Sequence, residues 1–318
     1  MHCMYLNIHC MPFHIYNRGT ASALTTRTIP RPFEIVEVRK AADVRLWPSL
    51  FTLQAPVVAV LWQLLLARSV HVKLNWFEPW ALGLAVWLIY VADHLIDTAK
   101  PAGKRWEPPR KEFCRQHRMA FLAMAFVVGV ILLLSVSRFL WAATVRGGWQ
   151  LSLGVACYFG VIHLTPRNWR SDWPREIVVA AIFTLGTFGA VWVGNGKNVL
   201  PLLAPAALFA MLCCANCSLI ETWEWEAAGG SEIDTPNLAA RWMAKHLARV
   251  GLAVAIISAA ALLTSMVPGG FAISAAISGA SLFVLSVFRH RIPVRLVSPV
   301  ADLALCWPFA VLVFLWLS

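Results

Sequence analysis

The chain has 318 residues, of which 59% are hydrophobic and only 14% charged, and its formal net charge is +11. A soluble domain has roughly a quarter of its residues charged, so this composition excludes an ordinary water-soluble protein. The positive charge would suit a nucleic-acid-binding protein, but the basic residues lie mostly between apolar stretches. The preference of cytoplasmic loops for Lys and Arg explains them without nucleic acid.

Residues 1–46 precede the first long apolar stretch and differ from the rest of the chain. They contain scattered prolines and no acidic residue before Glu34. The continuous apolar core that a secretory signal requires is missing. We expect a disordered cytoplasmic extension without a function of its own.

The remainder, residues 47–318, contains nine apolar stretches, each near the roughly 20 residues that a helix needs to cross a bilayer. Lipid offers no partner to unpaired backbone groups, so helices are the expected form. The sequence therefore predicts an all-α integral membrane protein, a single bundle of nine transmembrane helices. The expected spans are residues 49–68, 77–97, 119–137, 148–165, 176–194, 199–223, 247–266, 269–288 and 299–317.

Charge asymmetry orients this predicted bundle. With nine spans, most of the 27 Lys and Arg residues fall on the side that also holds the N-terminus. The positive-inside rule places that side in the cytoplasm and the C-terminus outside. We expect a bacterial cytoplasmic membrane, with the lipid bilayer as the main partner. No protein partner can be inferred.

Two aspartates at the cytoplasmic end of the second span are the most informative residues. The segment Tyr-Val-Ala-Asp-His-Leu-Ile-Asp ends in Asp93 and Asp97, whose four-residue spacing puts them on one helix face. Acidic residues in a span are functional candidates by default. A divalent cation would relieve their repulsion, and oxygen ligands favour Mg²⁺, which takes one or two carboxylates and completes its shell with water and phosphate. The alternative is a solvated pair at the helix-to-loop transition.

A second acidic group, Glu221, Glu224 and Glu226, ends the sixth span, again before a long basic loop. If it faces the first group, the two could hold Mg²⁺ against a substrate diphosphate while loop cations neutralise the remaining oxygens. The positive-inside rule alone also accounts for most of these cations. The candidates are Lys100, Lys104, Arg105, Arg110, Arg167, Arg170, Arg241 and Lys245.

These features resemble the UbiA superfamily of intramembrane prenyltransferases over about residues 47–318. The resemblance rests on Asp93-x-x-x-Asp97 followed by Lys100-Pro101, on the acidic stretch of the sixth span, and on the segment that contains Arg175 and Glu176. It implies nine helices and Mg²⁺-dependent transfer of a prenyl group from an allylic isoprenoid diphosphate to a hydrophobic, aromatic or lipid-like acceptor. It also implies that Asp93, Asp97, Glu221 and Glu224 are metal ligands.

Two departures from that family leave alternatives open. Ile89 and Tyr90 stand where the family has Asn-Asp, and glutamates replace the aspartates of the second motif. Tyr90 becomes a catalytic candidate, because an aromatic face one turn before Asp93 could stabilise an allylic cation. The chain is then either a divergent transferase or a transporter or lipid- or diphosphate-binding protein without activity. A CDP-alcohol phosphotransferase is a weaker alternative, because its longer motif is missing.

Overall fold

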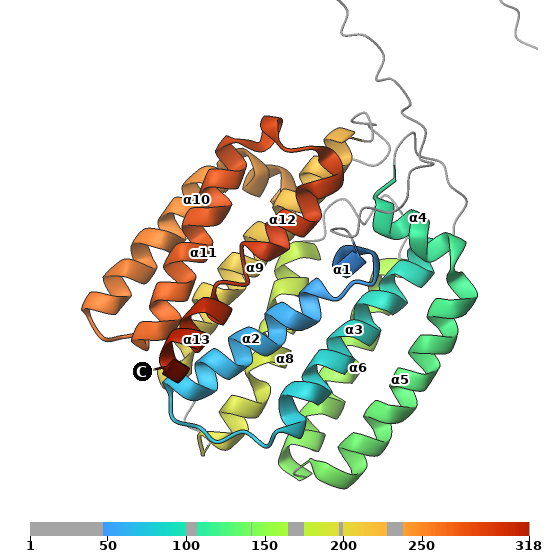
Figure 1. Ribbon diagram of the computed structural model, residues 1–318, viewed down its shortest axis with the longest axis horizontal. Helices are drawn as coiled ribbons and strands as arrows, with labels where there is room; N and C mark the ends of the chain where they lie inside the picture. The colour runs from blue at the N-terminus through green and yellow to red at the C-terminus, as the bar shows by residue number, and fades with distance from the viewer. Residues whose placement is uncertain are drawn as a thin grey trace, which may run out of the picture. The chain divides into compact units, whose positions relative to one another are not determined.

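The computed structural model describes residues 47–99, 107–140, 142–164, 175–196, 200–227 and 238–317, so the predicted extension at 1–46 lies outside the described residues. All regular elements in the described residues are helical (Figure 1). The α-helices are α1 (Trp47–Leu50), α2 (Gln54–Ser69), α3 (Phe77–Asp97), α4 (Pro109–Gln116), α5 (Arg118–Phe139), α6 (Ala142–Leu164), α8 (Arg175–Gly194), α9 (Leu200–Ala227), α10 (Leu238–Leu263), α11 (Gly269–Val287), α12 (Val297–Leu303) and α13 (Pro308–Leu317). Two 3-10 turns, η3 (Arg289–Arg291) and η4 (Val294–Leu296), join α11 to α12.

Seven segments in the described residues are long and apolar enough to cross a membrane, which supports an integral membrane protein. Each coincides with a span expected from the sequence. The seven are Phe77–Asp97, Arg118–Phe139, Arg175–Gly194, Leu200–Ala227, Lys245–Leu263, Gly269–Val287 and Val294–Leu317.

Two expected spans, α2 and α6, are not among these segments that are long and apolar enough to cross a membrane. The nine-span arrangement therefore stays a prediction. Helix α2 has only 16 residues, about 24 Å at 1.5 Å per residue, because Thr52 takes a positive φ of 55° and separates it from α1. Helix α6 has 23 residues, but Arg146 and Gln150 near its start lower its mean hydropathy. Both are nevertheless helices within the predicted regions.

The last expected span is interrupted. Helix α12 ends at Leu303, and α13 begins only at Pro308. The indole Nε1 of Trp62, on α2, donates a hydrogen bond of 2.8 Å to the carbonyl oxygen of Leu305 in this break. A carbonyl freed from a helix within a membrane needs such a partner, so Trp62 stabilises the interruption.

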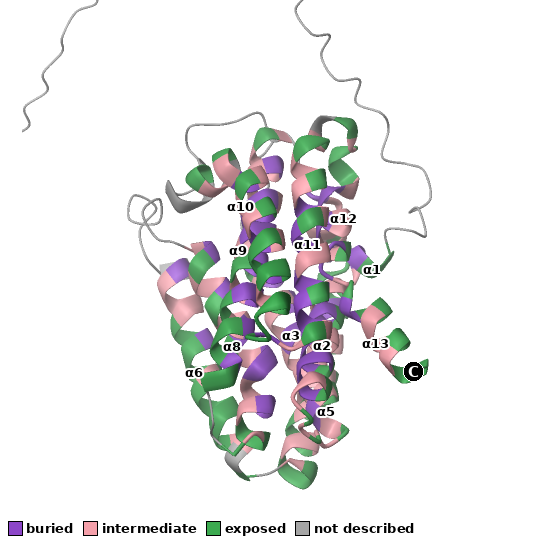
Figure 2. Cartoon of the chain, turned by 90° about the vertical axis from the view of Figure 1, so that its left-hand side faces the viewer, coloured by how far each residue is buried: buried purple, intermediate pink, exposed green. Residues whose placement is uncertain are grey.

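The core combines aromatic side chains from four helices. Trp62 lies with its ring centroid 4.9 Å from those of both Phe209 of α9 and Phe271 of α11, and Phe188 of α8 packs against the same two rings. By contrast, Phe121 is the one buried residue of α5. Figure 2 shows buried residues concentrated on the inward faces of the helices, with exposed residues along their outer sides. Apolar outer surfaces are expected where lipid is the solvent.

Helices α10 and α11 approach closely through two glycines. A Cβ on Gly251 would lie 2.9 Å from the carbonyl oxygen of Gly279, and a Cβ on Gly279 would lie 2.8 Å from that of Gly251. Small residues allow this backbone contact, a common way for helices to associate in membranes.

One end of the bundle gathers the residues considered next, and we call it the α4 end. Helices α3 and α9 finish there and α8 begins there, while the short helix α4 packs against α1, α3 and α5 (Figure 1). Pro109 occupies the first turn of α4, where its missing N–H costs no helical hydrogen bond. This arrangement brings residues far apart in sequence to one place.

Candidate functional site

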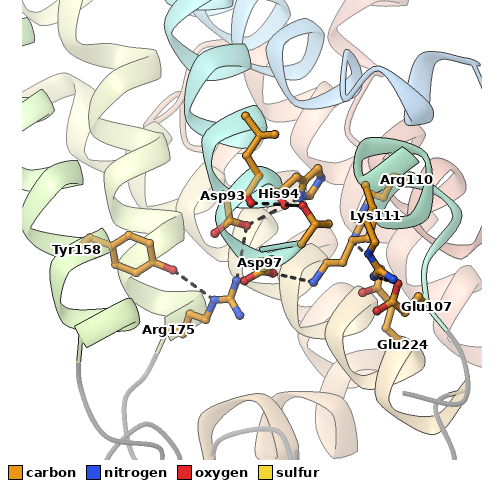
Figure 3. Close-up of polar contacts among 12 residues, drawn as sticks. Asp93, His94, Asp97, Glu107, Arg110, Lys111, Tyr158, Arg175 and Glu224 are labelled. Carbon is orange, nitrogen blue, oxygen red and sulfur yellow. Dashed lines mark hydrogen bonds and ion pairs between the residues drawn. The ribbon is translucent and has the colours of Figure 1, made fainter. Parts of the chain in front are cut away.

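Asp93 and Asp97 lie one turn apart on α3 at the α4 end, and both side chains are about three-quarters buried (Figure 3). Helix α3 ends directly after them. There the hydroxyl of Thr98 donates a 2.7 Å hydrogen bond to the carbonyl oxygen of His94. The pair therefore sits on the last turn, with protein on most sides.

Asp97 is paired with α4. The ammonium Nζ of Lys111 donates to Asp97 Oδ2 across 2.8 Å, and both side chains are largely shielded from solvent. This ion pair joins the end of α3 to the short helix that packs against it. A metal cation bound by Asp97 would therefore compete with Lys111 for the same carboxylate.

Asp93 faces a different cation, Arg175, the first residue of α8. The guanidinium Nη2 lies 4.0 Å from Asp93 Oδ2, and its Nε donates a 3.3 Å hydrogen bond to the hydroxyl of Tyr158 on α6 (Figure 3). A cation at the start of a helix opposes the helix dipole. Its place there is explained by the carboxylates around it.

The second acidic group meets the first at Arg175. Arg175 interacts electrostatically with both Asp93 and Glu221. Glu221 is in turn hydrogen-bonded to Glu176, which is 2% exposed. Two carboxyl groups in such contact need a shared proton or a cation between them. The acidic ends of α3 and α9 therefore face one centre.

Glu224 completes the link to α4. Its Oε1 lies 2.5 Å from Arg110 Nη2, and the other terminal nitrogen of Arg110 donates to the hydroxyl of Ser298 on α12. Five carboxyl groups and three cations thus make up this network in the described part of the chain. The carboxyl groups belong to Asp93, Asp97, Glu176, Glu221 and Glu224, and the cations to Arg110, Lys111 and Arg175.

The other predicted residues fall in three places. Tyr90 lies on α3, where it interacts electrostatically with Asp93 and with Asp302 of α12. Lys245 lines a separate cavity beside α10 and does not join the network. Arg241 lies on α10, and Arg110 belongs to the network. The other predicted diphosphate-binding residues lie outside the described residues; they are Lys100, Lys104, Arg105, Arg167 and Arg170.

Sequence reasoning did not assign Lys111 or Arg175 to the site. The available signal for Arg175 was its place at the start of an apolar helix, where a cation is unfavourable unless acids surround it. His94, the residue after Asp93, also lies at this end of α3. It is 5% exposed, its Nδ1 lies 4.0 Å from Asp93 Oδ2, and neither ring nitrogen has a hydrogen-bond partner within the described structure.

No protein family, curated protein or solved structure matches this chain.

Asp93 and Asp97 are oxygen ligands of the kind that Mg²⁺ takes in proteins. Within the described ranges, no three His, Cys, Asp or Glu side chains converge as metal ligands. A structural zinc site needs four ligands, whereas Mg²⁺ is typically bound through one or two carboxylates together with substrate phosphates. Asp93 and Asp97 supply two carboxylates, and carboxyl groups outnumber cations in the network.

Proposed function

We propose that the chain is a Mg²⁺-dependent intramembrane prenyltransferase of the UbiA type. It would transfer a prenyl group from an allylic diphosphate to an aromatic or lipid-like acceptor at the cytoplasmic membrane face. The observation that carries this proposal is that Arg175 lies 4.0 Å from Asp93 of α3 and also interacts electrostatically with Glu221 of α9. One cation therefore acts on both acidic groups that the resemblance assigns to diphosphate binding.

The proposed fold has nine spans, with α2 and α6 crossing beside the seven apolar segments. Helix α2 can do so if the membrane thins locally, because hydrophobic mismatch costs only fractions of a kcal/mol per Å. An odd number of spans puts the two termini on opposite sides of the membrane. The positive-inside rule then assigns the N-terminus and the α4 end to the cytoplasmic side and the C-terminus to the outside.

In this reaction the bond between the allylic carbon and the diphosphate oxygen breaks, the acceptor bonds to that carbon, and the acceptor loses a proton. Asp93 and Asp97 would hold Mg²⁺, which would supply positive charge to neutralise the departing diphosphate. Arg175 presents a planar fork of donors suited to phosphate oxygens. Tyr158 orients that fork through its contact with Nε.

Deeper in the bundle, Tyr90 supplies the aromatic face for the allylic cation. It stands one turn before Asp93 on the same helix. A ring next to a desolvated cation stabilises it by about 2 kcal/mol or more. Exclusion of water from this depth keeps the cation from being hydrolysed.

The test is diphosphate release from labelled allylic diphosphates of several chain lengths, with Mg²⁺ and a panel of phenolic and quinone-precursor acceptors. We expect Asp93→Asn, Asp97→Asn and Arg175→Gln each to lower turnover by on the order of 100-fold or more. Glu112→Gln is the matched control, since Glu112 lies on α4 but contacts only Gln116 in the described structure. Binding of the diphosphate without release from any donor and acceptor pair would refute the proposal.

A second candidate function, transport of an anionic lipid or diphosphate, is favoured by the break between α12 and α13. Transporters commonly place substrate or ion sites at discontinuous helices. Here Asp302 lies just before the break, and its Oδ1 accepts a 2.9 Å hydrogen bond from Asn216 of α9. A transporter would move labelled substrate across proteoliposomes, and Asp302→Asn would stop that flux.

A further inference from the structure

A cavity of about 280 Å³ lies between the α4-end portions of α9, α10 and α11. Its apolar lining comes from Leu219 and Trp223 of α9 and from Leu247 and Ala248 of α10. Its cations are Lys245 of α10 and Arg289 of η3. The full lining is Leu219, Thr222, Trp223, Lys245, Leu247, Ala248, Ser286 and Arg289. None of these residues belongs to the acidic network.

The cavity opens beside a basic stripe on α10. Arg241, Lys245 and Arg249 are spaced by four residues, so they lie along one helix face, and all three are exposed. The apolar segment of α10 begins at Lys245. The exposed Trp242 adjoins this point, and tryptophan is enriched at the level of lipid headgroups. The stripe therefore runs through the depth at which lipid phosphates lie.

Positive charge, rather than hydroxyl groups, must recognise a ligand here. The hydroxyl of Thr222 already donates to the carbonyl oxygen of Ser218, and that of Ser286 to the carbonyl oxygen of Phe283. Lys245 and Arg289 are the cations of the lining. Arg289 Nη1 stands 3.7 Å from Glu226 Oε1, a loose pair with both side chains a third or more exposed.

We propose that this cavity binds the headgroup phosphate of an anionic phospholipid from the same membrane leaflet. Lys245 and Arg289 contact the phosphate, and the acyl chains run down the exposed apolar sides of α10 and α11. Glu226 weakens the site by competing for Arg289. The inference goes beyond the proposed transferase activity and does not depend on it. It assigns Lys245 to a lipid instead of the substrate diphosphate.

The experiment titrates the purified full chain in detergent with phosphatidylglycerol or phosphatidylcholine and counts retained lipids by native mass spectrometry. Each cation near an anionic headgroup contributes about 1 kcal/mol, which corresponds to about fivefold in affinity. We expect Lys245→Gln and Arg289→Gln each to weaken phosphatidylglycerol binding about fivefold, and the double variant about 30-fold. Arg118→Gln, a cation at the start of α5, is the matched control and should retain the lipid.

Glu226→Gln gives an independent arm, because it removes a competitor without removing a ligand group. We expect tighter phosphatidylglycerol binding, and this outcome cannot arise from misfolding. Equal retention of both lipids, or unchanged binding by the double variant, would overturn the proposal. Displacement of the lipid by millimolar inorganic phosphate would also overturn it, because the cavity would then take a free anion.

Discussion

The hydrogen bond from Trp62 to the break between α12 and α13 gives a quantitative test of how the bundle is held together. Trp62→Phe keeps an aromatic ring but removes the donor, so the carbonyl oxygen of Leu305 stays buried without its 2.8 Å partner. An unsatisfied buried polar group costs about 1–3 kcal/mol. The smaller ring at a 0% exposed position adds roughly 1 kcal/mol for the space left behind. We expect the free energy of unfolding to fall by roughly 2–4 kcal/mol.

The assay is thermal unfolding in a mild detergent, followed by the loss of helical circular dichroism. Two tryptophan variants calibrate it. Trp87→Phe removes a 2.9 Å hydrogen bond to the carbonyl oxygen of Phe51, but that bond is only partly buried, so its loss should cost less. Trp316→Phe changes a ring that is 82% exposed and should cost almost nothing. If Trp62→Phe unfolds no earlier than Trp316→Phe, the bond does not stabilise the break.

Two further outcomes follow from other contacts. Gly251→Leu should destabilise the protein by about 1–3 kcal/mol or separate α10 from α11, because even a Cβ would meet the backbone of Gly279 at 2.9 Å. The measurement is the same loss of helical circular dichroism. Gly129→Leu on α5, where a Cβ meets nothing within 4 Å, is the control. Burial raises the pKa of the Cys114 thiol on α4, so N-ethylmaleimide should label it slowly at pH 7 and faster as the pH rises toward that pKa. Arg110→Gln should speed labelling at Cys114 by loosening α4. Rapid labelling at Cys114 itself at pH 7, located by peptide mass spectrometry apart from the exposed Cys157, would contradict the packing.

Hydropathy and spacing predicted the coarse architecture because they depend on local properties of the chain. Seven of the expected spans are long apolar segments in the structure. Asp93 and Asp97, four residues apart, both lie on the last turns of α3 at the α4 end. The break before Pro308 was not predicted, because the segment is apolar throughout and hydropathy does not register the Trp62 contact that stabilises the break.

The partners of the carboxylates were harder to predict, because they come from elements remote in sequence. Lys111 stands in a basic region where the positive-inside rule explains most cations, so nothing distinguished it from its neighbours. For Arg175 the one signal was its place at the start of an apolar helix, where a cation opposes the helix dipole. Lys245 shows the converse. Its charge made it a candidate for the diphosphate, and in the structure it lines a cavity with residues of α9 that do not belong to the network.

Arg110 and Lys111 are consecutive residues of α4, yet one holds Glu224 of α9 and the other Asp97 of α3. Because a single peptide unit joins the two cations, a displacement of this eight-residue helix as a whole would move both away from their carboxylates. One negative charge would then be exposed on the α3 side of the centre and one on the α9 side. The position of one short helix therefore affects the charge that both acidic groups present to a divalent ion or a phosphorylated ligand.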